Sequence, residues 1–240
     1  GAAAWFAAGG LADLALYQGR LADAAAILEP AIKGEPSASR RARLLVMLAE
    51  TRVLQGRNRD AVSLARQAIA LSPEAGINFL AGRVLSDCGQ HGPALEIVGK
   101  LLQRFDPESL AYARVLEGEI ALDRGDPRKA IERFKTAQQF ADSWLGRFGL
   151  GRAYLDADMV AEADSEFDVC LKRRGEATSA LLDDVPTYRL FAPVQYYQAR
   201  VREALGSPGA ADSYKAFLEI KKGGDEQGLV ADARKRLGTR

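Results

Sequence analysis

The stretch Leu11-Ala-Asp-Leu-Ala-Leu-Tyr-Gln-Gly-Arg-Leu-Ala-Asp-Ala-Ala-Ala-Ile-Leu-Glu-Pro-Ala31 holds the pattern that decides the fold. In it the small residue Ala12 is followed seven positions later by Gly19 and five positions after that by Ala24. Small residues on two consecutive helices, with a turn between them, predict an antiparallel helix pair whose axes approach closely.

The same spacing of small residue, turn residue and alanine occurs six times in the chain. The registers are Ala12–Gly19–Ala24, Ala49–Gly56–Ala61, Gly82–Gly89–Ala94, Gly118–Gly125–Ala130, Gly151–Asp158–Ala163 and Ala199–Gly206–Ala211. A unit this short cannot bury its own apolar face, so copies must stack on one another. We therefore expect an all-α fold, a right-handed superhelix (α-solenoid) of about six helix pairs.

The registers also set the expected organisation, which is a single array over residues 1–240. The helix pairs are expected at approximately 5–38, 42–74, 75–108, 111–143, 144–175 and 192–222. A capping helix over 225–238 should shield the last apolar face. In the sixth pair Lys215 interrupts the apolar stripe, and we expect Tyr214 to fill the site after a one-residue adjustment in Ser207-Pro208-Gly209.

Residues 175–193 form an irregular insertion between the fifth and sixth pairs. Its apolar residues, such as Val185 and Phe191, are too numerous for a solvated linker. One interpretation is that the insertion packs over the junction between these two pairs. The other is that it caps or partly fills the groove of the superhelix.

The pattern of Leu and small residue, turn glycine, alanine, large apolar residue, alanine and proline resembles the tetratricopeptide repeat. The first unit carries it as Leu11-Ala12, Gly19, Ala24, Leu28, Ala31 and Pro36. The fifth carries it as Leu150-Gly151, Tyr154, Ala163 and Phe167, with Asp158 at the glycine position. The family's tryptophan is missing throughout. The resemblance implies a non-catalytic module that binds a protein or peptide partner.

Residues 140–240 carry a narrower resemblance. Segments such as Leu150-Gly-Arg-Ala-Tyr154, Ala163-Asp-Ser-Glu-Phe167 and Asp183-Asp-Val-Pro-Thr-Tyr188 are similar to tetratricopeptide regions of bacterial signalling proteins, including those that follow eukaryotic-like Ser/Thr kinase domains. This implies a sensor or scaffold region. The kinase motifs themselves do not occur in the chain.

Charge and hydropathy exclude several classes of partner. The 33 basic and 32 acidic residues leave a net charge of +1, which gives no electrostatic reason to expect a nucleic acid or an anionic membrane. No apolar stretch approaches the ~20 residues that cross a bilayer. We expect a cytoplasmic location, or an extracytoplasmic one if the parent protein has a membrane span upstream.

A search for reactive groups yields no catalytic constellation. His91 is the only histidine and follows the turn at Gly89, while Cys88 and Cys170 lie far apart in helical patterns. This spacing matches neither a zinc site nor a nucleophile with its base. We expect no enzyme activity, no metal and no cofactor.

A partner site is expected on the concave face, which the first helix of each pair lines. Residues one place after the small anchors should point into it. They are Asp13, Glu50, Arg83, Glu119, Arg152 and Arg200, so the face is acidic at its N-terminal end and rich in arginine at its C-terminal end. An arginine beside an aromatic ring can hold a carboxylate while the ring covers an apolar group. The predicted partner-binding residues are Phe79, Arg83, Tyr112, Glu119, Phe148, Arg152, Tyr196 and Arg200.

Two functions remain open from the sequence. The first is a protein-interaction scaffold that binds a peptide or partner domain in this groove. The second is a self-associating structural element, a homodimer that uses Trp5 and Phe6 or the 175–193 insertion as its contact.

Overall fold

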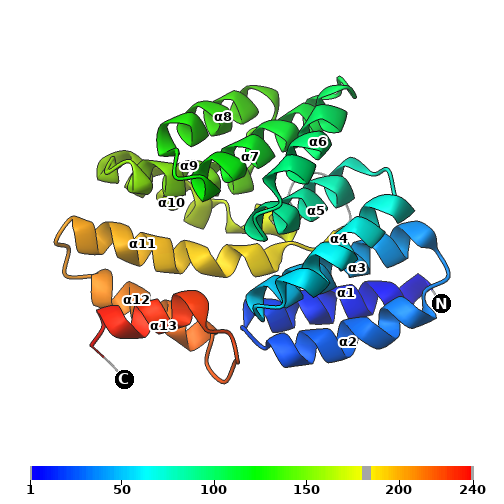
Figure 1. The fold of residues 1–240 in the computed structure, drawn as a ribbon. Coiled ribbons are helices and arrows are strands. Elements are labelled where there is room, and N and C mark those ends of the chain that lie inside the picture. Colours follow the sequence, from blue (N-terminus) through cyan, green and yellow to red (C-terminus); the bar gives the residue numbers. More distant parts are fainter. Residues whose placement is uncertain (1, 180–184, 239–240) are drawn as a thin grey trace.

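The computed structural model describes residues 2–179 and 185–238, and every regular element in this part of the chain is a helix. The helices follow one another as antiparallel neighbours and wind around a common axis (Figure 1). Their bounds are α1 (Ala2–Tyr17), α2 (Leu21–Gly34), α3 (Ala38–Leu54), α4 (Asn58–Leu71), α5 (Ala75–Asp87), α6 (His91–Leu102), α7 (Pro107–Asp123), α8 (Pro127–Phe140), α9 (Trp144–Asp156), α10 (Val160–Lys172), α11 (Ala192–Ala204), α12 (Ala210–Ile220) and α13 (Gly228–Arg236).

Six helix pairs, from α1/α2 to α11/α12, form the solenoid, and α13 follows the last pair. The helices α1, α3, α5, α7 and α9 each pack against the second helix of their own pair and against the first helix of the next pair. The first helices therefore line one side of the array. The predicted all-α solenoid is confirmed.

The turn position of each register has a left-handed backbone. The φ angles are 71° at Gly19, 72° at Gly56, 73° at Gly89, 73° at Gly125, 58° at Asp158 and 64° at Gly206. Glycine adopts this conformation without a steric cost, and aspartate tolerates it better than most residues do. Asp158 thus takes the glycine's place in the fifth turn.

The small anchors make room for aromatic rings of the second helices. A Cβ atom added at Gly118 would lie 2.8 Å from the ring of Phe134, and one added at Gly151 would lie 2.7 Å from the ring of Phe167. Both rings are fully buried. The glycines are therefore required by the close helix crossing.

The register differs from the prediction in the sixth pair. Ala211 is exposed, whereas Ser213 and Phe217 are buried. Helix α12 begins four residues after Gly206, while α2 begins two residues after Gly19. The longer turn moves the stripe by two residues rather than one, so Ser213 takes the alanine position, and Tyr214 is buried beside it.

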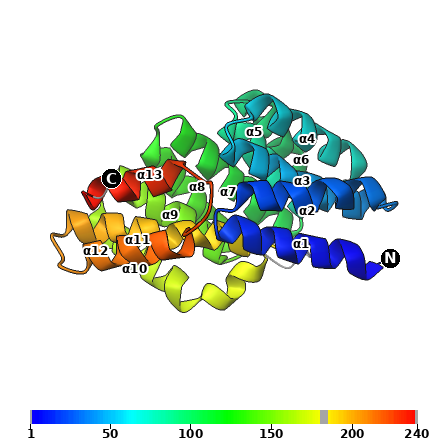
Figure 2. The same cartoon turned by 90° about the horizontal axis from the view of Figure 1, so that it is seen from below.

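The insertion contains two short 3-10 helices, η1 (Arg174–Thr178) and η2 (Tyr188–Phe191). The indole N–H of Trp144 donates a hydrogen bond to the carbonyl oxygen of Ser179 at 3.1 Å, which holds the insertion on α9. Helix η2 then packs on α1 and α11 (Figure 2). The insertion thus touches the fifth and sixth pairs and also the first. Residues 180–184, including the Asp183-Asp184 pair, lie outside the described residues.

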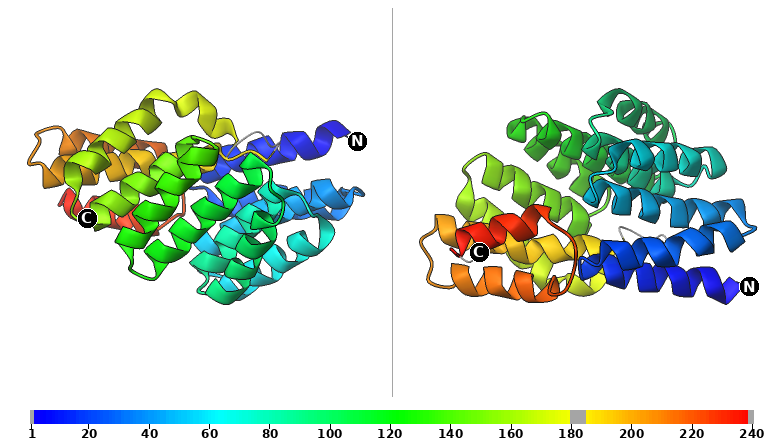
Figure 3. Two further views of the ribbon diagram at one scale, coloured as in Figure 1. Left: turned by 90° about the horizontal axis from the view of Figure 1, so that it is seen from above. Right: turned by 60° about the horizontal axis from the view of Figure 1, so that its bottom comes forward.

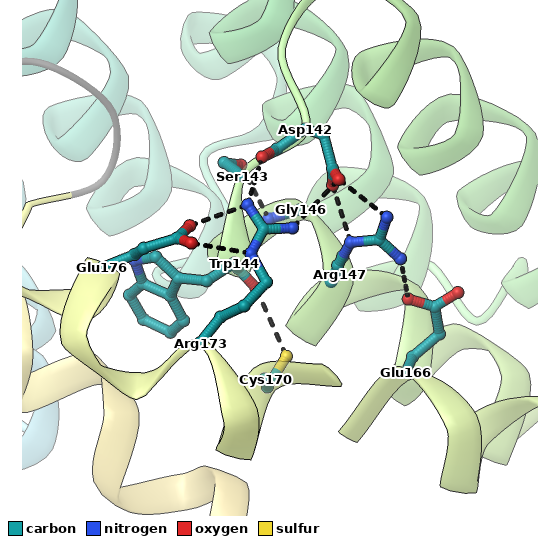
Figure 4. Close-up of polar contacts among 9 residues, drawn as sticks. All are labelled: Asp142, Ser143, Trp144, Gly146, Arg147, Glu166, Cys170, Arg173 and Glu176. Atoms are coloured by element: carbon teal, nitrogen blue, oxygen red, sulfur yellow. Dashed lines mark hydrogen bonds and ion pairs between the residues drawn. The ribbon is translucent and has the colours of Figure 1, made fainter. Parts of the chain in front are cut away.

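A network around Asp142 fixes η1 beside the start of α9 (Figure 4). The Asp142 carboxylate accepts hydrogen bonds from Arg147 at 2.6 and 2.7 Å and from Arg173 at 2.9 Å. Arg173 also pairs with Glu176 of η1 at 2.7 Å. Partial burial raises the pKa of Asp142, but the hydrogen bonds from the two arginines outweigh it and hold the pKa below its ordinary value.

The two ends of the array are joined by residues 221–226, which we call the clasp. The clasp connects α12 to α13 and lies against the turn between α1 and α2 (Figure 3). The backbone N–H groups of Asp225 and Glu226 donate to the carbonyl oxygen of Gly19 at 2.9 and 3.1 Å. The approach is close, since a Cβ atom added at Gly224 would lie 2.5 Å from that oxygen.

Side chains strengthen the clasp. The Lys221 ammonium donates to the carbonyl oxygen of Leu16 at 3.2 Å and pairs with Glu226 at 2.7 Å. Both charged side chains are buried. Buried charges persist when they are paired and hydrogen-bonded, and both conditions are met here. The solenoid is therefore closed on itself.

Candidate functional site

A cavity of about 290 Å³, which we call the chamber, lies on the concave side of the first helices. Helix α3 contributes Glu50, α5 contributes Arg83, and α9 contributes Phe148 and Arg152. The remaining wall comes from α1, η2, α11, the clasp and α13. Three of the predicted partner-binding residues, Arg83, Phe148 and Arg152, are thus brought together.

Arg83 is held in an ion pair with Glu119 of α7 at 2.7 Å, and both side chains are largely buried. Burial works against the charge of Arg83, but the nearby carboxylates Glu119, Glu50 and Asp87 outweigh it and raise the pKa of Arg83. Two of the predicted binding residues therefore satisfy each other across neighbouring helices.

The acidic end of the predicted groove is covered from within the chain. Arg189 of η2 donates to Asp13 of α1 at 3.0 Å and pairs with Glu50 of α3. All three side chains are buried. Burial works against the charge of Arg189, yet Glu50 and Asp13 raise its pKa. The insertion thus fills the N-terminal part of the concave face, beside the chamber.

Arg152 has a different environment from the other arginines of the chamber. Its guanidinium carbon lies 5.8 Å from the ring centroid of Phe148 and 5.6 Å from that of Tyr197. No carboxylate of the described residues lies within ion-pair distance of it. Burial works against its charge, while Tyr197, Glu119 and Asp87 raise its pKa. Arg152 is a stacked cation that points into the chamber without a counter-ion at contact distance.

Asp87 lies one helical turn after Arg83 and also lines the chamber. Solvent reaches its side chain, although protein surrounds it on most sides. Desolvation by the surrounding protein raises the pKa of Asp87 to about 7. The positive charge of Arg83 lowers this pKa, and the negative charges of Glu119 and Asp123 raise it. Asp87 forms neither a hydrogen bond nor an ion pair among the described residues.

The other predicted residues do not reach the chamber, so this part of the prediction is corrected. Phe79 and Tyr112 are buried and stack on each other with ring centroids 4.5 Å apart. These positions face the neighbouring first helix rather than the open concave side. Tyr196 is buried against Tyr214 and hydrogen-bonds Asp232 of α13.

Arg200 lies beside this contact and donates to the Tyr196 hydroxyl oxygen at 3.3 Å. Because α13 covers the end of the last pair, Arg200 belongs to the α11/α13 junction. It does not line the chamber.

Comparison with known proteins identifies the family. The sequence profile of the tetratricopeptide repeat matches residues 10–75 and 115–172, just over half of the chain. The chain is a tetratricopeptide-repeat protein. Proteins of this family are in general non-catalytic interaction modules, which supports a scaffold role. No functionally curated protein is significantly similar in sequence.

Solved structures show the same fold for the tetratricopeptide array. The Cut9–Hcn1 hetero-tetramer of the APC/C matches 97% of this chain and 42% of its own, with 18% identity and a TM-score of 0.55. The human IFIT1 dimer with m7Gppp-AAAA matches 84% of this chain and 48% of its own, with 18% identity and a TM-score of 0.60. The array spans less than half the length of these chains, and the likeness concerns the fold.

Several residues of the chamber were not predicted from the sequence. The position of Asp87 could have indicated its place in the chamber, because it follows Arg83 by one helical turn on the same face. Tyr197 directly follows the predicted Tyr196. Arg189, Lys221 and Glu226 come from irregular segments, where the repeat gives no register.

The described residues contain no group of three or more potential metal ligands. Among the helices of the described ranges, none is both long and apolar enough to span a bilayer.

Proposed function

We propose that this tetratricopeptide array is a protein-interaction scaffold that binds a short acidic segment of a partner in the chamber. The observation that carries the proposal is Arg152, a cation that lies against the rings of Phe148 and Tyr197 and is not paired with a carboxylate of the described residues. An arginine in this setting can bind a carboxylate through two parallel hydrogen bonds, while the rings exclude water from the contact.

The closed shape limits how much of a partner can enter. Arg189 occupies the acidic end of the concave face, and the clasp and α13 form another wall of the chamber. A volume of about 290 Å³ lies at the lower end of ligand pocket sizes. The proposed contact is therefore a few residues of the partner rather than a helix laid along the groove.

The test is partner capture followed by a matched comparison of variants. Proteins captured by the wild-type chain are identified, and binding of each is then measured with Arg152→Glu and with Arg66→Glu, which changes an exposed arginine of α4 away from the chamber. Arg152→Glu should abolish binding, and Arg66→Glu should preserve it, at unchanged helicity by circular dichroism. Equal binding by both variants would refute the assignment of the site.

A second candidate function is self-association through α1. This helix exposes large apolar side chains: Phe6 is 63% exposed, Leu11 57% and Leu14 48%. Trp5 is less available, since it is partly buried with Arg40 and Arg43 near its ring. Exposed apolar faces of this kind mark interaction surfaces. Light scattering over a range of concentrations tests it, and a monomer at every concentration would exclude it.

We also propose that the array belongs to a bacterial signalling protein and works in the cytoplasm. The support is the resemblance of residues 140–240 to tetratricopeptide regions of such proteins. The coding sequence on either side of this chain tests the context, because a kinase domain would support it and a domain of unrelated function would not.

A further inference from the structure

Some of the cations that line the chamber form an ion pair with a carboxylate of the described residues, and one does not. Three of the four have a carboxylate partner, and the fourth is Arg152. The three pairs are Arg83–Glu119, Arg189–Glu50 and Lys221–Glu226. Any anion that enters the chamber therefore meets Arg152 as the cation that is open to it.

The carboxylates of the chamber also divide into paired and unpaired groups. Glu50, Asp87 and Glu226 line it, and Glu50 and Glu226 are engaged with Arg189 and Lys221. Within the described chain Asp87 has no such partner. The chamber thus offers one unpaired cation on α9 and one unpaired carboxyl group on α5, which is ionised above its pKa of about 7.

These two groups are close but not in contact. Each changes the pKa of the other through its charge, yet they form no ion pair. A ligand that forms an ion pair with each of the two groups must carry both charges itself. A ligand with a negative charge alone would bind Arg152 and leave its charge close to the Asp87 carboxylate, which repels it.

We propose that the partner segment held in the chamber is dipolar, with an acidic side chain bound to Arg152 and a nearby basic side chain bound to Asp87. This inference rests on the proposed function and adds the chemical class of the ligand. The chamber is also lined by apolar side chains, among them Leu190, Tyr197 and Leu229. An apolar residue between or beside the two charged ones would fit there.

Selection from a random heptapeptide library displayed on phage tests this ligand class. The wild-type chain and the variants Arg152→Gln and Asp87→Asn are used as targets. Two controls carry equivalent changes on exposed sites outside the chamber, Arg66→Gln on α4 and Glu96→Gln on α6.

The wild-type chain and both controls should enrich peptides that contain an acidic and a basic residue close together. Arg152→Gln should remove the requirement for the acidic residue, and Asp87→Asn the requirement for the basic one. A synthetic peptide of the wild-type consensus should bind each of these two variants about tenfold or more weakly. Arg152→Lys keeps the charge and should retain the acidic preference.

Enriched peptides without a charge pair, or a pair that both chamber variants still require, would overturn the inference and leave the proposed function standing. If no target enriches any peptide, the proposed function and the inference both fail. Melting curves of the variants establish that each target is folded.

Discussion

Asp225 caps a helix that begins 204 residues before it, because its carboxylate accepts hydrogen bonds from the backbone N–H of Leu21 at 2.6 Å and of Ala22 at 3.2 Å. The residue that precedes α2 in the chain, Arg20, provides no side-chain cap. The first N–H groups of a helix lack partners within the helix, and a carboxylate also suits the helix dipole there. The last part of the chain thus completes the second helix.

Removal of this cap should destabilise the whole array. We expect Asp225→Ala to lower the free energy of unfolding by about 0.5–2 kcal/mol, the usual cost of a lost N-cap. Urea denaturation measures it. Asp212→Ala is the control, because Asp212 is exposed on α12 and pairs only with Lys215 at 3.6 Å. An equal effect of both substitutions would contradict the role of Asp225.

Arg189 should be among the most sensitive positions of the chain. Arg189→Met leaves the buried carboxylates of Asp13 and Glu50 without their cation, and the expected cost is about 3–5 kcal/mol. The combination with Asp13→Asn and Glu50→Gln removes both uncompensated charges and should recover much of the loss. Thermal unfolding of the single and triple variants measures both effects. No recovery in the triple variant would show that the charges are not the cause.

Alanine substitutions at two helical glycines should change the free energy of unfolding in opposite directions. Gly151→Ala places a Cβ atom 2.7 Å from the Phe167 ring and should cost roughly 1–3 kcal/mol through overpacking. In Gly99→Ala the added Cβ meets nothing within 4 Å, and alanine favours the helix, so a gain of about 0.5–1 kcal/mol is expected. Chemical denaturation of the two variants measures the difference. Two changes of the same sign would place the close crossing elsewhere.

Asp87 should make stability depend on pH near neutrality. Its folded pKa of about 7 lies above the ordinary value of about 3.9 in an unfolded chain. Between these values the folded state binds more protons, so the contribution of Asp87 to stability falls as the pH rises. The melting temperature of Asp87→Asn minus that of the wild type should therefore increase from pH 5 to pH 8.

The Asp87 effect depends on its surroundings, which include Arg83, Arg152, Glu119 and Asp123. Glu96→Gln, on the exposed side of α6, serves as the control for the loss of a surface carboxylate. If the Asp87→Asn difference stays constant from pH 5 to pH 8, the Asp87 carboxyl is not perturbed in the folded state.

The parts of the fold that follow from local spacing could be predicted from the sequence. The turn at Asp158 has the left-handed backbone of the glycine turns, and Gly118 and Gly151 meet the aromatic residues of their second helices. The shift at Ser213 escaped prediction, because the length of an irregular turn is not encoded in the repeat. The spacing predicts Phe79 and Tyr112 on the concave face, but it does not specify whether a residue of a first helix faces the groove or the neighbouring first helix.

The chamber was only partly predictable for a related reason. Arg83, Phe148 and Arg152 follow from the register of the first helices. The partners of Arg189, Asp13 and Glu50, lie 176 and 139 residues away in sequence. The clasp depends on an equally distant contact. Such pairings depend on how far the superhelix curves over all six units, which a single repeat does not determine.

The clasp changes the thermodynamics expected of a repeat protein. In an open solenoid each unit contacts only its neighbours, and terminal units can fray independently. Here the clasp and α2 share the hydrogen bonds that the Asp225 carboxylate accepts from Leu21 and Ala22, so fraying of one end removes support from the other. Amide exchange should accordingly show similar protection in α2 and α12, and the array should lose its two ends in one cooperative step.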